Sequence, residues 1–161
     1  MNGIIKITFS LFFLLSCNSF KLAPGEDLSN LVFKDIKDKT FQISDIKSKY
    51  LLISFLAPWC KVCINELPDL ASVDKKINVS VLFIVEDASK KELDNIIKEN
   101  NLQQLLIVHD TSAKYKKLFK VKAYPETFLL KDNKLQLFLS KNNNLTLKAK
   151  GVFDWESFLF N

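Results

Sequence analysis

The chain has 161 residues, of which 48% are hydrophobic and 25% charged, and this composition fits one globular domain and argues against a disordered protein. The formal net charge is +5, and all 23 basic residues are Lys. Because there is no Arg to supply the bidentate contacts that phosphate and guanine recognition often uses, and because the Lys residues are interleaved with Asp and Glu, we expect a solvated surface and no nucleic-acid partner. We also expect a monomer.

Residues 1–16 predict a signal peptide. A short segment with one Lys precedes the apolar run 7–15, which is too short to span a bilayer comfortably. The run ends in Leu-Leu-Ser-Cys, which resembles a bacterial lipoprotein signal, in which Cys17 is acylated and becomes the first mature residue. The alternative is an ordinary secretory signal followed by a chance cysteine. On the lipoprotein interpretation, residues 17–30 form a polar tether that leads from the acyl chains, which hold it to a membrane, to the domain of residues 31–161.

Within this domain, strands are expected to alternate with helices. Apolar runs of strand length predict strands at residues 31–36, 40–43, 50–56, 79–85, 105–108, 127–130 and 135–139. Apolar residues at helical spacing predict helices at residues 64–77, 89–99 and 112–119, and a last helix from Asp154. This order predicts an α/β fold with a mixed sheet covered on both faces, an N-terminal β-hairpin and no second domain.

The sequence Ala-Pro-Trp-Cys-Lys-Val-Cys, residues 57–63, lies where a predicted strand is followed by a helix. If the helix begins near Cys60, the N–H groups of its first turn and the positive end of its dipole favour a thiolate on Cys60, and Lys61 adds a positive charge. Cys63 lies three residues later on the same helix face, so that small shifts close and open a disulfide. This pattern favours reversible exchange, in which one sulfur attacks and the other resolves.

Two other interpretations use the same cysteines: a permanent structural disulfide, and half of a zinc site. Zinc requires about four ligands, usually in two pairs. Only Cys17 and the single His109 remain, and Cys17 is assigned to the lipid. We therefore expect neither a metal nor another cofactor.

Residues 55–63 resemble the active site of a thioredoxin-like fold, in which Cys-x-x-Cys follows a strand. Three further features narrow the resemblance to the membrane-tethered TlpA/ResA-like thiol–disulfide oxidoreductases. They are the Glu-Leu-Pro of residues 66–68, the inserted strand–helix region of residues 79–108, and the Tyr-Pro-Glu-Thr-Phe of residues 124–128. The resemblance covers residues 28–161, essentially the whole mature domain.

The resemblance implies substrate-binding roles for three residues. Pro125 is expected to be a cis-proline that faces the disulfide, and Tyr124 to present its backbone groups to a substrate strand. Trp59 is expected to cover Cys60 and to shape the docking surface. Pro68 is expected to kink the helix that carries the cysteines.

Glu66 is the expected catalytic partner of Cys60 and Cys63. It lies three residues after Cys63 on the same helix face, and related extracytoplasmic reductases carry Glu at this position. A carboxylate there accepts a proton when a thiol is activated and raises the thiol pKa while it is charged. In ordinary thioredoxins a buried Asp late in the preceding strand does this work, but that position is Ser54 here. Glu86, at the end of the next strand, is a weaker candidate, and a solvated helix residue is the alternative reading of Glu66.

The resulting expectation is an enzyme that reduces disulfides in extracytoplasmic client proteins and receives electrons from an integral-membrane thiol–disulfide donor. Run in reverse, the same chemistry gives an oxidase or isomerase, and the dipeptide Lys61-Val62, without the proline common in reductive relatives, leaves the direction open. Sco-type copper chaperones share the fold but use a wider cysteine spacing and a distant His, for which His109 is available. Peroxide reduction requires Thr three residues before the reactive cysteine, where this chain has Ala57. A binding module with a permanent disulfide is the remaining alternative.

Overall fold

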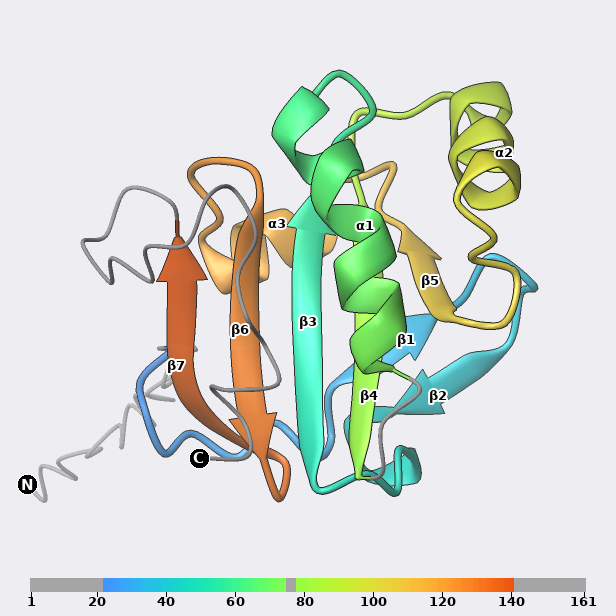
Figure 1. Ribbon diagram of the computed structural model, residues 1–161. Helices are drawn as coiled ribbons and strands as arrows, with labels where there is room; N and C mark the ends of the chain where they lie inside the picture. Colours follow the sequence, from blue (N-terminus) through green and yellow to red (C-terminus); the bar gives the residue numbers. More distant parts are fainter. Residues whose placement is uncertain (1–21, 75–77, 141–161) are drawn as a thin grey trace, which may run out of the picture.

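The computed structural model describes residues 22–74 and 78–140 (Figure 1). Cys17, the expected signal peptide and the expected helix from Asp154 lie outside these residues. No helix in the part of the chain that the structure describes is long and apolar enough to cross a membrane.

The described elements follow the order that the sequence predicts. The strands are β1 (Val32–Lys34), β2 (Thr40–Gln42), β3 (Tyr50–Leu56), β4 (Val79–Val85), β5 (Leu106–His109), β6 (Glu126–Lys131) and β7 (Lys134–Ser140). The helices are α1 (Lys61–Val73), α2 (Lys90–Glu99) and α3 (Lys114–Phe119), with one 3₁₀ turn, η1 (Ile43–Asp45). Each strand and helix expected within the described residues is present, and the remaining differences concern the ends of elements, where helices fray and turns compete.

Five strands form the main sheet, in the order β5-β4-β3-β6-β7. The central strand β3 runs parallel to β4 and antiparallel to β6, and β4 runs parallel to β5. In this register Leu56 pairs with Val85, and Phe55 pairs with Glu126. The residues that follow β3 and β4 therefore lie at the same end of the sheet as the residues that precede β6.

Alternate side chains of β3 enter opposite halves of the core. Leu52 and Leu56 pack in the half that contains the buried residues of α1 and α2. Leu51, Ile53 and Phe55 pack in the other half, with the β1–β2 hairpin and α3. Helices thus cover both faces of the mixed sheet, as the sequence predicts, with α1 in front of the sheet and α3 behind it in Figure 1.

The segment before the hairpin packs against the sheet. The backbone N–H of Gly25 donates to the carbonyl of Leu135 at 2.7 Å, and the N–H of Leu28 donates to the carbonyl of Asn133 at 3.0 Å. Gly25 has φ of 88°, which glycine adopts without strain, and the side chain of Leu28 is buried. The packed part of the chain therefore begins before residue 31, because buried Leu28 lies within the polar segment 17–30 that was expected to be a tether.

Candidate active site

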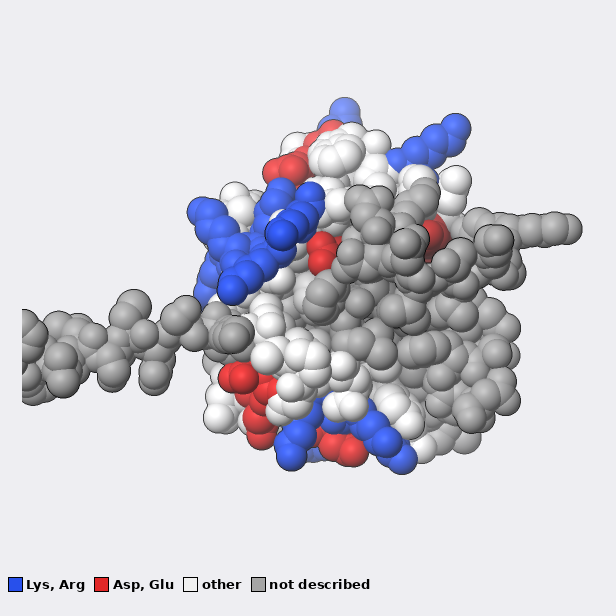
Figure 2. Space-filling view, turned by 90° about the vertical axis from the view of Figure 1, so that its left-hand side faces the viewer, with Lys and Arg blue, Asp and Glu red and all other residues white. Residues whose placement is uncertain are grey.

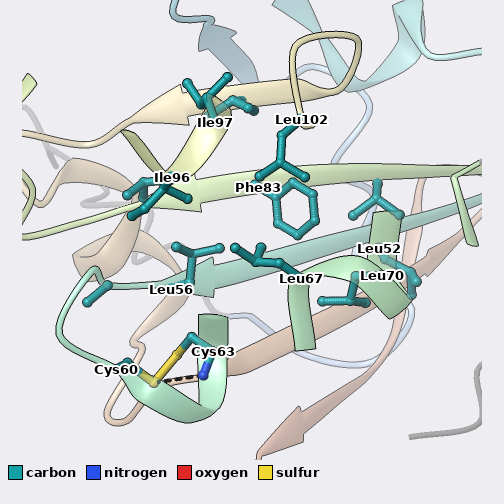
Figure 3. Packing of buried hydrophobic residues seen from close by; sticks show 14 of the residues in the cluster. Leu52, Leu56, Cys60, Cys63, Leu67, Leu70, Phe83, Ile96, Ile97 and Leu102 are labelled. Atoms are coloured by element: carbon teal, nitrogen blue, oxygen red, sulfur yellow. Dashed lines mark hydrogen bonds between the residues drawn. A yellow bond between two sulfur atoms is a disulfide. The ribbon is translucent and has the colours of Figure 1, made fainter. Parts of the chain in front are cut away.

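The two candidate cysteines form a disulfide at the N-terminus of α1. Their Cα atoms are 5.3 Å apart, and the backbone N–H of Cys63 donates to Sγ of Cys60 with an N–S distance of 3.2 Å (Figure 3). Cys60 is the N-cap residue of the helix, one position before the first turn. Its sulfur therefore accepts one of the N–H groups that a helix leaves without an intrahelical partner, and this contact favours a thiolate once the disulfide is reduced.

Both cysteines belong to the core at the end of the sheet, where Figure 3 shows them beside Leu56. Cys60 is 7% exposed and Cys63 is 3% exposed. Both residues are therefore buried, and Cys60 is slightly the more exposed of the two.

The loop that precedes β6 lies at the same end of the sheet as the disulfide. The Tyr124–Pro125 peptide bond is cis, which confirms the expected backbone conformation. Because Glu126 pairs with Phe55, this loop adjoins the segment that links β3 to α1. The Tyr124 side chain packs against the core cluster that contains Cys60 and Cys63.

Trp59 and Tyr124 form an aromatic pair beside the disulfide. Their ring centroids are 5.5 Å apart, and the ring planes meet at 77°, an edge-to-face arrangement. Trp59 is 67% exposed, which is unusual among the aromatic side chains of the described residues. The indole, held by a second ring and adjacent in sequence to Cys60, is thus an exposed apolar surface beside the disulfide.

Glu86 lies beneath this aromatic pair. It directly follows β4, and its side chain is only 1% exposed. The hydroxyl of Tyr124 donates to Oε2 of Glu86 at 2.9 Å, and Nζ of Lys116 lies 3.6 Å from the same oxygen. Oε1 has no hydrogen-bond partner among the described residues. Burial raises the pKa of Glu86, because the Tyr124 and Lys116 contacts offset only part of the loss of hydration.

The same environment acts on the phenol and on the lysine. Burial raises the pKa of Tyr124 to about 12, so the phenol remains a hydrogen-bond donor throughout the physiological range. Nζ of Lys116 also lies 4.9 Å from the centroid of the Tyr124 ring, within cation–π range. The sequence did not predict a role for Lys116 of α3. It lies 8 residues before Tyr124 and 30 residues after Glu86, and no spacing in the sequence indicates that these three residues meet. Glu86 could be proposed from the sequence because it directly follows an apolar run that predicts a strand.

Glu66 lies in α1, one turn after Cys63, and is partly buried. The structure therefore keeps it on the helix that carries the disulfide, while Glu86 lies at the end of β4. Ser54 is buried and accepts a hydrogen bond from Thr127 Oγ1 at 3.0 Å. A neutral hydroxyl pair thus fills the position at which ordinary thioredoxins are expected to carry an acid.

His109 lies at the end of β5, and its ring contacts the backbone. Its Nε2 lies 2.9 Å from the carbonyl oxygen of Ala88, and because a carbonyl only accepts, this nitrogen carries the proton. No group of three or more His, Cys, Asp or Glu side chains within residues 22–74 and 78–140 is arranged to hold a metal ion.

The model of the AhpC/TSA family matches residues 24–137, most of the chain. The chain belongs to this family. Among curated relatives it is similar to the thiol-disulfide oxidoreductases ResA of Oceanobacillus iheyensis and of Bacillus subtilis. The identities are 29% and 28%, over 69% and 68% of this chain. The matches span 58% and 62% of the length of those two proteins.

Solved structures show the same fold. A secreted disulfide oxidoreductase of Mycobacterium tuberculosis, described as homologous to DsbE of E. coli, gives a TM-score of 0.63 at 19% identity, over 76% of this chain and 89% of the other. The thioredoxin domain of a Bacteroides vulgatus thiol-disulfide oxidoreductase gives 0.65 at 18% identity, over 88% and 100%. The expected thioredoxin-like α/β fold is confirmed.

Proposed function

We propose that this protein is a thiol–disulfide oxidoreductase that reduces disulfides in client proteins outside the cytoplasm. The observation that carries the proposal is the disulfide at the N-terminus of α1, in which Cys60 accepts an N–H from the helix and lies near the aromatic pair of exposed Trp59 and partly buried Tyr124. The ResA relatives, which are named thiol-disulfide oxidoreductases, support the same reaction class.

The reaction begins from the dithiol form. The Cys60 thiolate attacks one sulfur of a client disulfide, a mixed disulfide forms, and the other client sulfur leaves as a thiolate that takes up a proton. The thiol of Cys63 then loses its proton and attacks Sγ of Cys60, and the second client thiolate leaves and is protonated. The client gains two electrons and two protons, and the protein reaches the disulfide form seen in the structure.

Three residues are assigned to client binding in this proposal. Trp59 and Tyr124 supply the apolar contact, and the backbone of Tyr124 beside Pro125 pairs with an extended client segment. Glu66 is assigned to proton transfer, because it lies one turn from Cys63 on the helix that carries both sulfurs.

A trapping experiment tests the assignment of the sulfurs. Cys63→Ser is expected to accumulate a mixed disulfide with clients, because nothing resolves the bond at Cys60. Cys60→Ser is the matched control and is expected to trap none. Complexes are counted on non-reducing gels before and after dithiothreitol. Equal trapping by both variants, or by neither, would contradict the proposal. Rapid consumption of peroxide by the reduced protein would favour peroxide reduction instead, although Ala57, which is buried, provides no hydroxyl three residues before Cys60.

The reduction potential of the cysteine pair tests the direction of electron flow. A reductase is expected to have a potential near that of thioredoxin, about −270 mV, whereas a strong oxidant such as DsbA lies at about −120 mV. A value close to the second figure would overturn the reductive direction while leaving the exchange chemistry intact.

The proposal also includes the location of the protein. Cys17 is assigned as the acylated residue that anchors the domain to the outer side of a membrane, where an integral-membrane thiol–disulfide donor renews the dithiol. The lipoprotein ending of the signal sequence supports this assignment. Cys17→Ser is expected to abolish incorporation of labelled palmitate and to release the protein from the membrane fraction. Retention of the label would contradict the assignment.

A further inference from the structure

Helix α3 and the residues that follow it, as far as Lys122, carry an unusual concentration of positive charge. Five Lys and no Asp or Glu occur among residues 111–125. Four of these Lys side chains are exposed, and we refer to them together as the α3 lysine patch: Lys114, Lys117, Lys120 and Lys122. Elsewhere in the chain the lysines are interleaved with Asp and Glu, and this segment departs from that pattern.

The fold forces these lysines outward. Tyr115 and Phe119, four residues apart on one face of α3, are buried in the core half that contains Phe33 and Phe55. The opposite face is left for charged side chains. In Figure 2, Lys side chains gather on the left of the view, the side to which α3, behind the sheet in Figure 1, is turned.

The patch is continuous with the candidate active site through Lys116. This residue contacts Glu86 and the Tyr124 ring, and Tyr124 contacts Trp59. Glu86 and the exposed Asp87 balance the charge of Lys116, and both raise its pKa, although the Tyr124 hydroxyl contributes more. No ion pair involves the four lysines of the α3 lysine patch in the part of the chain that the structure describes. Their charge is therefore available to a partner that docks beside the disulfide.

We propose that the α3 lysine patch binds acidic residues that flank the reactive cysteines of a client, so that the enzyme selects acidic client segments. This inference rests on the proposed function and names the substrate class of the same site. Exposed ammonium groups act as hydrated point charges on flexible stems, so they attract carboxylates without fixing one geometry. Such contacts speed encounter more than they strengthen the final complex, and the effect is lost as salt screens charges beyond about 8–10 Å.

The test uses single-turnover exchange, which requires no membrane donor. The full chain is reduced with dithiothreitol, desalted and mixed with a peptide that contains one disulfide. Two peptides have the same length and cysteines, and four Asp flank the cysteines in one where four Ser flank them in the other. The test variant is Lys114→Glu/Lys117→Glu/Lys120→Glu. The matched control is Lys47→Glu/Lys49→Glu/Lys134→Glu, because these three exposed lysines lie at the end of the sheet where β3 begins, about 20 Å from its active-site end.

At low salt, the wild-type protein is expected to reduce the acidic peptide about tenfold faster than the neutral one, and 0.5 M NaCl is expected to remove the difference. The triple variant is expected to lose the preference and to keep the rate on the neutral peptide, while the control retains the preference. Equal rates on both peptides with the wild-type protein would overturn the inference. So would equal loss in the control, or salt-sensitive binding of the patch to anionic phosphatidylglycerol vesicles without any peptide preference. If the wild-type protein reduces neither peptide, the proposed function itself fails, and this inference fails with it.

Discussion

The hydroxyl of Tyr124 donates a 2.9 Å hydrogen bond to Oε2 of Glu86, a carboxylate that is 1% exposed. Tyr124 precedes the cis-proline and contacts exposed Trp59 with its ring, so a buried acid is linked to the surface at which a client is proposed to dock. Glu86 therefore fixes the position of the Tyr124 hydroxyl.

Tyr124→Phe is expected to lower the free energy of unfolding by about 1–3 kcal/mol, because Oε2 of buried Glu86 loses a hydrogen-bond donor. It is also expected to slow exchange with a peptide disulfide several-fold, since the ring is no longer held against Trp59. Tyr115→Phe is the matched control, because its hydroxyl donates to the carbonyl of Val32 at 3.0 Å, in the other core half. The control should lose stability and keep the exchange rate. Unchanged exchange by Tyr124→Phe would show that the bond serves stability alone.

Glu86→Gln is expected to change how stability depends on pH. Because burial raises the pKa of Glu86 above its ordinary value of 4.5, the folded state holds this proton at pH values where the unfolded state has lost it. The contribution of Glu86 is therefore most favourable below pH 4.5 and declines as the pH rises toward the raised pKa. Gln does not ionise, so the stability of the variant relative to the wild-type protein should increase between pH 4.5 and 7.5. Urea unfolding at several pH values measures this difference, and a decrease with pH would contradict the assigned direction.

Glu66→Gln tests the proposed proton-transfer role. A charged carboxylate one turn from Cys63 disfavours a thiolate, so its removal should move the pH midpoint of cysteine alkylation in the reduced protein to lower values. The rate of exchange should lose part of its pH dependence at the same time. Asp69→Asn, six residues after Cys63 in the same helix, is the control and should leave both profiles unchanged. A midpoint that does not move in Glu66→Gln would remove Glu66 from the mechanism.

Asp110→Ala is expected to destabilise the protein by about 2 kcal/mol or more. The buried carboxylate of Asp110 accepts hydrogen bonds from the backbone N–H groups of Lys114, Tyr115 and Lys116, at 2.8, 2.8 and 3.0 Å. Removing it leaves three donors at the start of α3 without this acceptor. Thermal unfolding measures the loss. Asp110→Asn retains one acceptor oxygen and should recover part of the stability, and equal stability of all three proteins would contradict this capping role.

Much of the fold was predictable because the apolar runs and the helical spacing of apolar residues are clear in this chain. Strand β4 has the predicted bounds, Val79–Val85, since seven consecutive residues rich in β-branched and aromatic side chains leave little ambiguity. The role of Leu28 was harder to predict. A single apolar residue in a polar segment has no period, and only its pairing with the β6–β7 turn shows that it is packed.

The candidate site was predictable where its residues are close in sequence. Cys60 and Cys63 follow from the strand–helix junction and their spacing, and the cis bond at Pro125 follows from the resemblance. The contacts of Glu86 with Tyr124 and Lys116 join residues from β4, the loop before β6, and α3. Such contacts depend on strand order and register, which one sequence does not specify in full.

The central claim is that the Cys60–Cys63 pair cycles between a disulfide and a dithiol. It is tested most directly by equilibrating the protein in a series of dithiothreitol redox buffers, quenching with acid and counting free thiols by alkylation and mass spectrometry. The expected result is a reversible two-electron transition with one midpoint, the same when approached from the oxidised or the reduced protein. A disulfide that stays closed across the whole series, in a protein that remains folded, would contradict the claim and favour a permanent structural bond.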